Sequence, residues 1–147
     1  MEKLRKQRND FNQVYGEWEG IYHQISQKAG ISEISYRILY MVCESEFSWS
    51  QIDICRFWNY PKQSVNSAVT KLVKDEYVFL IQDKTAKNRK VIKLTKKGIE
   101  FCNKWICPVI IADLNSFASL SEEERDLYIN FMKRMCDNFK VNLKDIL

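Results

Sequence analysis

Residues that interrupt helices are scarce in this chain. Its 147 residues include only four glycines and two prolines. These two residue types are the strongest punctuation between structural elements, so a chain poor in both is more easily built from helices than from many short strands. We therefore expect a mainly α fold with few sharp changes of direction.

The composition is that of a folded domain without a membrane span. Hydrophobic residues make up 46% and charged residues 29%, which are ordinary values for globular proteins. No apolar run reaches about 18 residues, so no membrane partner is expected. The start of the chain has no apolar core of a signal peptide. We expect a single domain over residues 1–147 and a cytoplasmic location.

Helical periodicity marks both ends of the chain. A long first helix is expected over residues 3–28, with Gly30 as its stop. A second long helix should follow Thr95 and kink at Pro108, which has no N–H to donate. Ser121 precedes a run of acids, which is typical of a helix start. The apolar stripes are Phe11, Val14, Trp18, Ile21, Tyr22 and Ile25 in the first helix and Leu127, Phe131, Met135 and Phe139 in the last.

Two capped helices are predicted after Gly30. Ser32 can cap the first of them. Ser50 followed by Asp53 matches a capping box at the start of residues 51–58. The side chains expected to point inward are Ile34, Ile38, Met41 and Val42 in the first helix and Ile54, Phe57 and Trp58 in the second.

A tight connection then leads into an amphipathic helix. Asn59 and Tyr60 form the connection, and Pro61 suits the first turn of a helix over residues 61–75 because its missing N–H would be unpaired there. A short helix, a tight turn and an amphipathic helix form a helix-turn-helix unit. The predicted buried face of the last helix is Val65, Ala68, Val69, Leu72 and Val73.

Two β-prone runs, residues 77–82 and 90–95, come next. The loop between them is longer than a two-residue hairpin turn, so it should protrude. Residues 84–98 contain seven lysines and arginines and no acid. A basic hairpin directly after a helix-turn-helix unit predicts a winged helix. The expected fold class is therefore mainly α with a small β-hairpin.

Positive charge is concentrated in this central part. Residues 62–97 hold ten Lys and Arg against three acids, although the whole chain carries only +4. Such a concentration of like charge favours a polyanionic partner, and small polar side chains on a helix suit a DNA major groove. We expect double-stranded DNA as the partner. The predicted DNA-binding residues are Lys62, Gln63, Ser64, Asn66, Ser67, Thr70 and Lys71 on the helix and Lys84, Lys87, Arg89 and Lys90 on the wing.

Residues 50–98 resemble the DNA-binding core of MarR-family transcriptional regulators. The matching text is SQIDICRFWNYPKQSVNSAVTKLVKDEYVFL, followed after a basic loop by RKVIKLTKKG. The resemblance implies a winged helix-turn-helix lobe over residues 32–97, with dimerisation helices in residues 1–31 and 98–147. It also implies a homodimer on a pseudo-palindromic operator, and we expect a repressor that responds to a small-molecule effector.

Two positions depart from the family's usual pattern. Glu76 stands where relatives commonly have Gly at the end of the recognition helix. Relatives also commonly place an Asp shortly before the wing Arg, whereas Asp83 lies six positions before Arg89. Arg89 is the predicted wing residue for the minor groove. The effector pocket implied by the resemblance would be lined by Trp18, Tyr22, Tyr36, Arg37 and Tyr40, for which packing in the core is the alternative.

Catalytic and metal sites have no visible signature. His23 is the single histidine, and no glycine-rich phosphate loop is present, so we expect no enzyme activity, metal or cofactor. The five cysteines are odd in number and include no C-x-x-C pair, which favours buried free thiols. The alternative is an oxidant-sensing thiol at Cys102 or Cys107, near Lys104.

One rival function uses the same fold. A winged helix can serve as a protein-interaction module without specific DNA binding. The two functions differ in an observable way, because phosphate contacts make DNA affinity depend steeply on salt.

Overall fold

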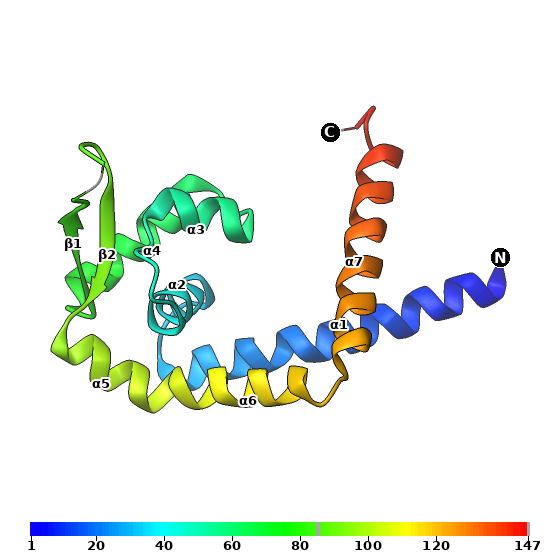
Figure 1. Cartoon of the computed structure of the whole chain (residues 1–147), viewed down its shortest axis with the longest axis horizontal. Coiled ribbons are helices and arrows are strands. Elements are labelled where there is room, and N and C mark those ends of the chain that lie inside the picture. The colour runs from blue at the N-terminus through cyan, green and yellow to red at the C-terminus, as the bar shows by residue number, and fades with distance from the viewer. Residues whose placement is uncertain (85, 147) are drawn as a thin grey trace. The chain divides into compact units, whose positions relative to one another are not determined.

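The computed structural model describes residues 1–84 and 86–146; Thr85, in the predicted wing loop, lies outside them. The described residues form seven α-helices and one two-stranded sheet (Figure 1). The predicted fold class is therefore confirmed. The elements are α1 (Glu2–Ala29), α2 (Glu33–Glu44), α3 (Gln51–Trp58), α4 (Lys62–Lys74), β1 (Val78–Gln82), β2 (Lys90–Leu94), α5 (Lys96–Trp105), α6 (Cys107–Ala118) and α7 (Glu122–Asn142).

The chain divides into two compact units, residues 1–110 and 111–147. The first unit contains α1 to α5, the hairpin and the first turn of α6, and the second contains the rest of α6 and α7. The division into a lobe over residues 32–97 and flanking dimerisation helices stays a prediction. Within the described ranges, no helix is both long enough and apolar enough to cross a membrane.

Local caps set the helix ends where they were predicted. Gly30 ends α1 in the left-handed region with φ of 75°. The Ser32 hydroxyl accepts a backbone hydrogen bond at the start of α2. Ser50 and Asp53 form a complete capping box on α3, and Ser121 begins a second one on α7. These boundaries depend on side chains within three positions, which is why the sequence predicts them well.

Both prolines lie next to helix starts. Pro61 is the N-cap of α4 and not part of its first turn, so the helix begins at Lys62, one residue later than predicted. The expected long helix after Thr95 is interrupted at Ile106, where φ is −108°, and α6 begins at the next residue. Pro108 cannot donate the hydrogen bond that would continue the α5 ladder. The helix is thus interrupted two residues before Pro108, and the predicted kink itself stays a prediction.

The core of the first unit is centred on α2, which packs against α1, α4, α5 and β2. Ile38 and Leu39 are fully buried there. Two predictions of burial are wrong, because Phe57 is 61% exposed and Val73 is 40% exposed. Phe57 packs edge-on against its aromatic neighbours instead of entering the core, and Val73 lies at the edge of the buried stripe. The remaining fully buried side chains include Ile54, Val65, Val69, Leu72, Val78, Ile92 and Ile106.

The cysteines were predicted to be buried, but they differ in exposure. Cys102 is buried, but Cys136 on α7 is exposed, and the other three are partly exposed. The prediction of buried thiols is therefore correct for Cys102 and wrong for Cys136. All five are free thiols.

The two strands form an antiparallel hairpin that we call the wing. Its register runs from Val78 opposite Leu94 to Gln82 opposite Lys90. The wing is also tied to the segment before α3, because the Ile92 N–H donates to the Trp49 carbonyl at 2.8 Å. This bond fixes the base of the wing beside the helix-turn-helix unit.

A compact junction connects the end of α4, the wing and the start of α5. Glu76 adopts the left-handed region with φ of 61°. The Thr95 hydroxyl donates to the Glu76 carbonyl at 2.6 Å, and its oxygen accepts from the Gly98 N–H at 2.9 Å. A Cβ at Gly98 would lie only 2.0 Å from the Tyr77 carbonyl oxygen. Gly98 is therefore required by a close backbone approach.

The close backbone approach at Gly98 predicts that one added methyl group there strongly lowers stability. Gly98→Ala should lower the free energy of unfolding by about 1–3 kcal/mol, because backbone atoms of Tyr77 must move away. Gly16→Ala is the control, since a Cβ there would meet no described atom within 4 Å. It should instead stabilise α1 by about 0.5–1 kcal/mol. Urea unfolding monitored by circular dichroism measures both; equal effects at the two glycines would contradict the prediction.

Candidate nucleic-acid interface

The outward face of α4 brings together all seven predicted helix residues. Ser64 is half-buried, whereas Lys62, Gln63, Asn66, Ser67, Thr70 and Lys71 are exposed. The opposite face packs against α2, α3 and β1. A shallow hollow of about 520 Å³ runs along the exposed side and is lined by Asn66, Ser67, Thr70, Lys71, Lys74 and Asp75. The helix thus presents small polar and basic groups that no other described element covers.

One of these lysines already has a partner. The Lys71 ammonium lies 3.0 Å from the Asp75 carboxylate, one turn further along the exposed side. Both groups are accessible to solvent, so the pair is weak and can exchange for another anion. Asp75 would then lie beside that anion, which makes this end of α4 less attractive to phosphate than the end at Lys62.

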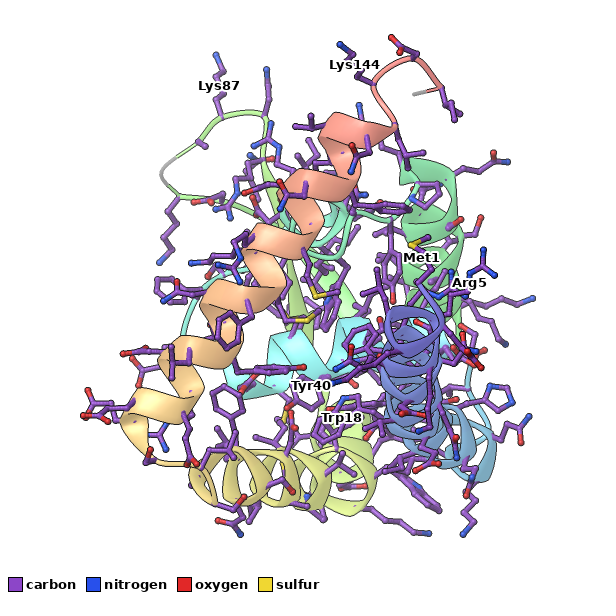
Figure 2. All side chains as sticks on the ribbon, turned by 90° about the vertical axis from the view of Figure 1, so that its right-hand side faces the viewer. Met1, Arg5, Trp18, Tyr40, Lys87 and Lys144 are labelled. Atoms are coloured by element: carbon purple, nitrogen blue, oxygen red, sulfur yellow. The ribbon has the colours of Figure 1, made fainter. Side chains whose placement is uncertain are left out.

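A single amide side chain shapes the wing loop. Gln82 Nε2 donates to the carbonyls of Ala86, Lys87 and Arg89 at 3.0, 2.8 and 3.0 Å. The loop is closed by the Asp83 N–H, which donates to the Arg89 carbonyl at 2.7 Å. These bonds hold the backbone while the side chains of Lys84, Lys87 and Lys90 remain exposed. Figure 2 shows Lys87 at the outer end of the wing, pointing away from the rest of the molecule.

Arg89 is held by the body of the protein. Its Nη2 donates to Asp53 Oδ2 at 2.7 Å and to the Ser48 carbonyl at 2.6 Å. Its Nη1 donates to Asp83 Oδ2. Hydrogen bonds to Asp53 and then Asp83 raise the pKa of Arg89 above its ordinary value. Arg89 therefore braces the wing against the start of α3, and its role as a minor-groove contact stays a prediction.

Asp53 carries two roles in this brace. Its Oδ2 accepts from the Ser50 N–H at 2.9 Å, as in the capping box, and also from Arg89. Partial burial opposes ionisation of this carboxyl, but hydrogen bonds from Ser50 and Arg89 outweigh it and lower the pKa of Asp53 to about 2. The carboxylate is thus stabilised by its contacts across the whole neutral range.

A cavity of about 640 Å³ lies between the start of α3 and the wing. Basic side chains of Arg56, Lys87 and Lys90 line it, together with Asn88 and the Arg89 brace. Sequence reasoning had not selected Arg56 or Asn88. Arg56 follows Asp53 by three positions on α3, so its position beside the wing could have been inferred once the short helix was placed.

The predicted effector residues lie in a packed aromatic cluster. Tyr22, Tyr36, Arg37 and Tyr40 are at most 8% exposed, whereas Trp18 is 43% exposed. The Arg37 guanidinium lies over the Tyr22 ring at 3.8 Å from its centroid. Arg37 Nη2 also donates to both carboxylate oxygens of Glu19, at 3.2 and 3.1 Å. The guanidinium that was expected to receive an anionic ligand is therefore occupied by a carboxylate of the chain itself.

Comparison with known proteins identifies the arrangement. A sequence profile of the MarR family matches residues 29–87, which run from the end of α1 into the wing loop. This segment, which includes α2, α3, α4 and β1, is thus similar to the MarR family. No curated protein sequence matches it significantly. In the part of the chain that the structure describes, no cluster of three or more His, Cys, Asp or Glu side chains is arranged to hold a metal ion.

Several solved MarR-family structures share the fold. The transcription regulator MarR from Oenococcus oeni PSU-1 has a TM-score of 0.74 and 13% identity, over 89% of this chain and 98% of that one. Staphylococcus aureus MepR in a DNA-binding conformation has a TM-score of 0.72 and 19% identity, over 90% and 98%. A MepR variant from the same organism, bound to an oligodeoxyribonucleotide, has a TM-score of 0.54 and 19% identity, over 90% and 97%.

The structure accounts for both departures from the usual MarR pattern. Glu76 takes up the left-handed conformation itself, with φ of 61°, and the Thr95 hydroxyl binds its carbonyl. Two carboxylates support Arg89: that of Asp83, across the closed loop, and that of Asp53 on α3. A carboxylate directly before Arg89 is therefore not needed to hold its guanidinium.

The low pKa of Asp53 predicts a pH-dependent contribution to stability. The pKa of the Asp53 carboxyl is about 2 in the folded chain, against 3.8 for the same group without these contacts. Its contribution to stability is therefore complete above about pH 4 and is lost as the pH falls through 2. Discounted for partial exposure, it is about 1–2 kcal/mol. Asp53→Asn should lower the free energy of unfolding by that amount at pH 7, and by progressively less below pH 4.

Urea unfolding at pH steps from 7 to 3 measures this difference. Asp10→Asn is the control, because Asp10 pairs with Lys6 on the exposed surface of α1 at 2.8 Å. Such a pair contributes at most about 0.5 kcal/mol. If the loss caused by Asp53→Asn were the same at pH 3 as at pH 7, the brace would not depend on the ionised carboxylate.

Proposed function

We propose that this protein is a MarR-family regulator that binds double-stranded DNA sequence-specifically as a homodimer and represses transcription. The observation that carries the proposal is the placement of two basic surfaces on one lobe. The exposed face of α4 offers base-reading and phosphate-binding groups, and the wing beside it carries exposed Lys84, Lys87 and Lys90. The MepR structures described as DNA-bound or DNA-binding share this fold. Action on DNA is consistent with the expected cytoplasmic location.

The division of labour within the interface follows from side-chain chemistry. Gln63 and Asn66 lie on the exposed face of α4, and their amides can pair with adenine edges in a major groove. The lysines of α4 and the wing would neutralise phosphates and fix the register. Two copies of α4 in successive major grooves would be about 34 Å apart.

Exposed apolar surface supports the homodimer. Residues 1–18 are exposed throughout, and this part of α1 includes Phe11, Val14 and Trp18. In the second unit the whole predicted stripe of α7 is exposed: Leu127 53%, Phe131 48%, Met135 52% and Phe139 65%. Large contiguous apolar patches are rare on monomers. We expect a second copy of the chain to cover them.

Control of the dimer by an effector would have to overcome the Glu19–Arg37 pair. An anionic ligand could bind Arg37 only by displacing Glu19, whose side chain is 45% exposed and can swing into solvent. Such a ligand would be held between the Tyr22 and Trp58 rings that flank the guanidinium. Binding of this kind would shift α1 relative to α2, since Glu19 and Arg37 lie on those two helices.

The salt dependence of DNA binding tests the proposed function. A selection from genomic fragments supplies an operator duplex, and fluorescence anisotropy then measures affinity at increasing salt. The logarithm of affinity should fall by about 0.9 for each neutralised phosphate per unit of log salt. Lys87→Ala should reduce this slope by about one unit while leaving stability unchanged, because the Lys87 side chain is exposed.

Lys28→Ala is the matched control. It removes one exposed lysine from the last turn of α1, away from the wing, so its salt slope should equal that of the wild type. A flat slope for the wild type would favour the rival function, a protein-interaction module without specific DNA binding.

The homodimer makes a separate prediction. Phe131→Glu should convert the dimer to a monomer of 17.5 kDa, because a charge buried in an apolar interface without a partner is costly. Lys133→Glu introduces the same side chain two positions later on α7, off the apolar stripe, and should leave the dimer intact. Sedimentation velocity distinguishes the two masses; dimers of both variants would show that α7 does not form the interface.

A further inference from the structure

Residues 32–97 contain three arginines, and two of them are occupied within the fold. Arg37 is paired with a carboxylate of α1, and Arg89 is held by two carboxylates and a backbone carbonyl. Arg56 on α3 is exposed and has no hydrogen bond, ion pair or ring contact in the part of the chain that the structure describes. Arg56 can therefore bind a ligand without giving up a contact of the fold.

Arg56 lies on the side of α3 that faces the wing. It follows Asp53 by about one helical turn, and Asp53 Oδ2 accepts from Arg89 Nη2 at 2.7 Å. The cavity of about 640 Å³ between α3 and the wing is lined by Arg56 together with the exposed Lys87 and Lys90. Asp53 is the one acid among its described lining residues, and it is already paired with Arg89. Three exposed cations thus surround one space, which favours an anion there.

We propose that Arg56 binds a phosphate of the DNA backbone in this cavity, and that it makes the arginine contact beside the wing in place of Arg89. This assignment rests on the proposed DNA binding and deepens it, because it adds a contact from α3 to those from α4 and the wing. A phosphate diester exposes two oxygens that match the planar fork of a guanidinium. Lys87 and Lys90 hold the same strand as point charges.

The size of the cavity favours a DNA strand over a single ion. At about 30 Å³ for each water molecule, the cavity has room for about twenty waters, which is far more than one phosphate ion fills. The wing lysines that line it also belong to the proposed DNA interface, so the cavity continues that surface. A sugar–phosphate backbone can therefore run between α3 and the wing, whereas an isolated ion would leave most of the space to water.

Arg89 is the competitor for this contact, but it would have to leave its brace to reach DNA. That movement would take a guanidinium away from Asp53 and Asp83, whose side chains are only 31% and 9% exposed. Removing the cation from a largely buried carboxylate is costly. Arg56 loses only the rotational freedom of an exposed side chain. Arg56 is therefore the favoured contact, and Arg89 keeps the wing in position for it.

Alanine variants separate the roles of the two arginines. With the operator duplex from the genomic selection, Arg56→Ala should weaken binding about tenfold and reduce the salt slope by about one unit, because one phosphate contact is lost. Its melting temperature should equal that of the wild type, since the Arg56 side chain is exposed and makes no contact. Arg89→Ala should instead lower the melting temperature, on the order of 5 °C, because it removes the brace.

Neutral phosphates in the operator identify the contact directly. Each phosphate of the half-site is replaced in turn by an uncharged methylphosphonate, and fluorescence anisotropy measures the affinity of the wild type and of Arg56→Ala. At one position the replacement should weaken the wild type about tenfold but Arg56→Ala much less, because that variant has already lost the contact. A free phosphate ion in the cavity would give no such position and would overturn the assignment.

Two further variants complete the experiment. Arg56→Lys keeps the charge but not the fork, so it should restore the salt slope and only part of the affinity. Lys28→Ala removes an exposed cation from α1 and should respond to every methylphosphonate as the wild type does. A steep salt slope that Arg56→Ala leaves unchanged, or a methylphosphonate effect that disappears only in Arg89→Ala, would overturn the assignment while DNA binding stands. Binding by the wild type that does not depend on salt would overturn both.

Discussion

The approach of Gly98 to the Tyr77 carbonyl is the contact on which the geometry of the lobe depends. Within a few residues of it α4 ends, the wing begins and ends, and α5 begins. A side chain at Gly98 would lie 2.0 Å from the carbonyl oxygen, so the four elements can meet only because none is present. Thr95 completes the junction by binding the Glu76 and Tyr77 carbonyls, at 2.6 and 3.2 Å. The orientation of the wing beside α4 is therefore set by a close approach of backbone atoms.

Within the basic hairpin, Arg89 has a structural role, whereas the charges of the lysines remain exposed. The most basic side chain of the loop is paired with two carboxylates and is turned towards α3. The lysines, whose charges lie on flexible stems, remain at the surface. Arginine suits the first role because its planar fork binds several acceptors at once, and lysine suits the second as a mobile point charge. The basic run in the sequence thus contains one residue, Arg89, whose structural role cannot be inferred from its charge.

Sequence reasoning was accurate where structure depends on near neighbours and weaker where it depends on distant ones. Helix ends at Gly30, Ser50 and Ser121 follow from caps within three positions, so they were predictable. The Asp53–Arg89 bond spans 36 positions, and no local pattern links the two residues. Phe57 had the spacing of a core residue, yet it packs against neighbouring rings at the surface, since periodicity gives a face but not what covers it. The placement of the polar face of α4 could be predicted because its opposite face is continuous and apolar.

The three bonds from Gln82 have a consequence for how this wing can vary. They draw the backbone of the loop together from one side chain on β1, and the Arg89 N–H closes a turn onto the Ala86 carbonyl at 3.1 Å. The Lys84 and Lys87 side chains are exposed and make none of these bonds, so they can change identity while the loop keeps its shape. Under the proposed function, substitution at the tip of the wing would change binding without first lowering stability, because contact and folding would depend on different residues.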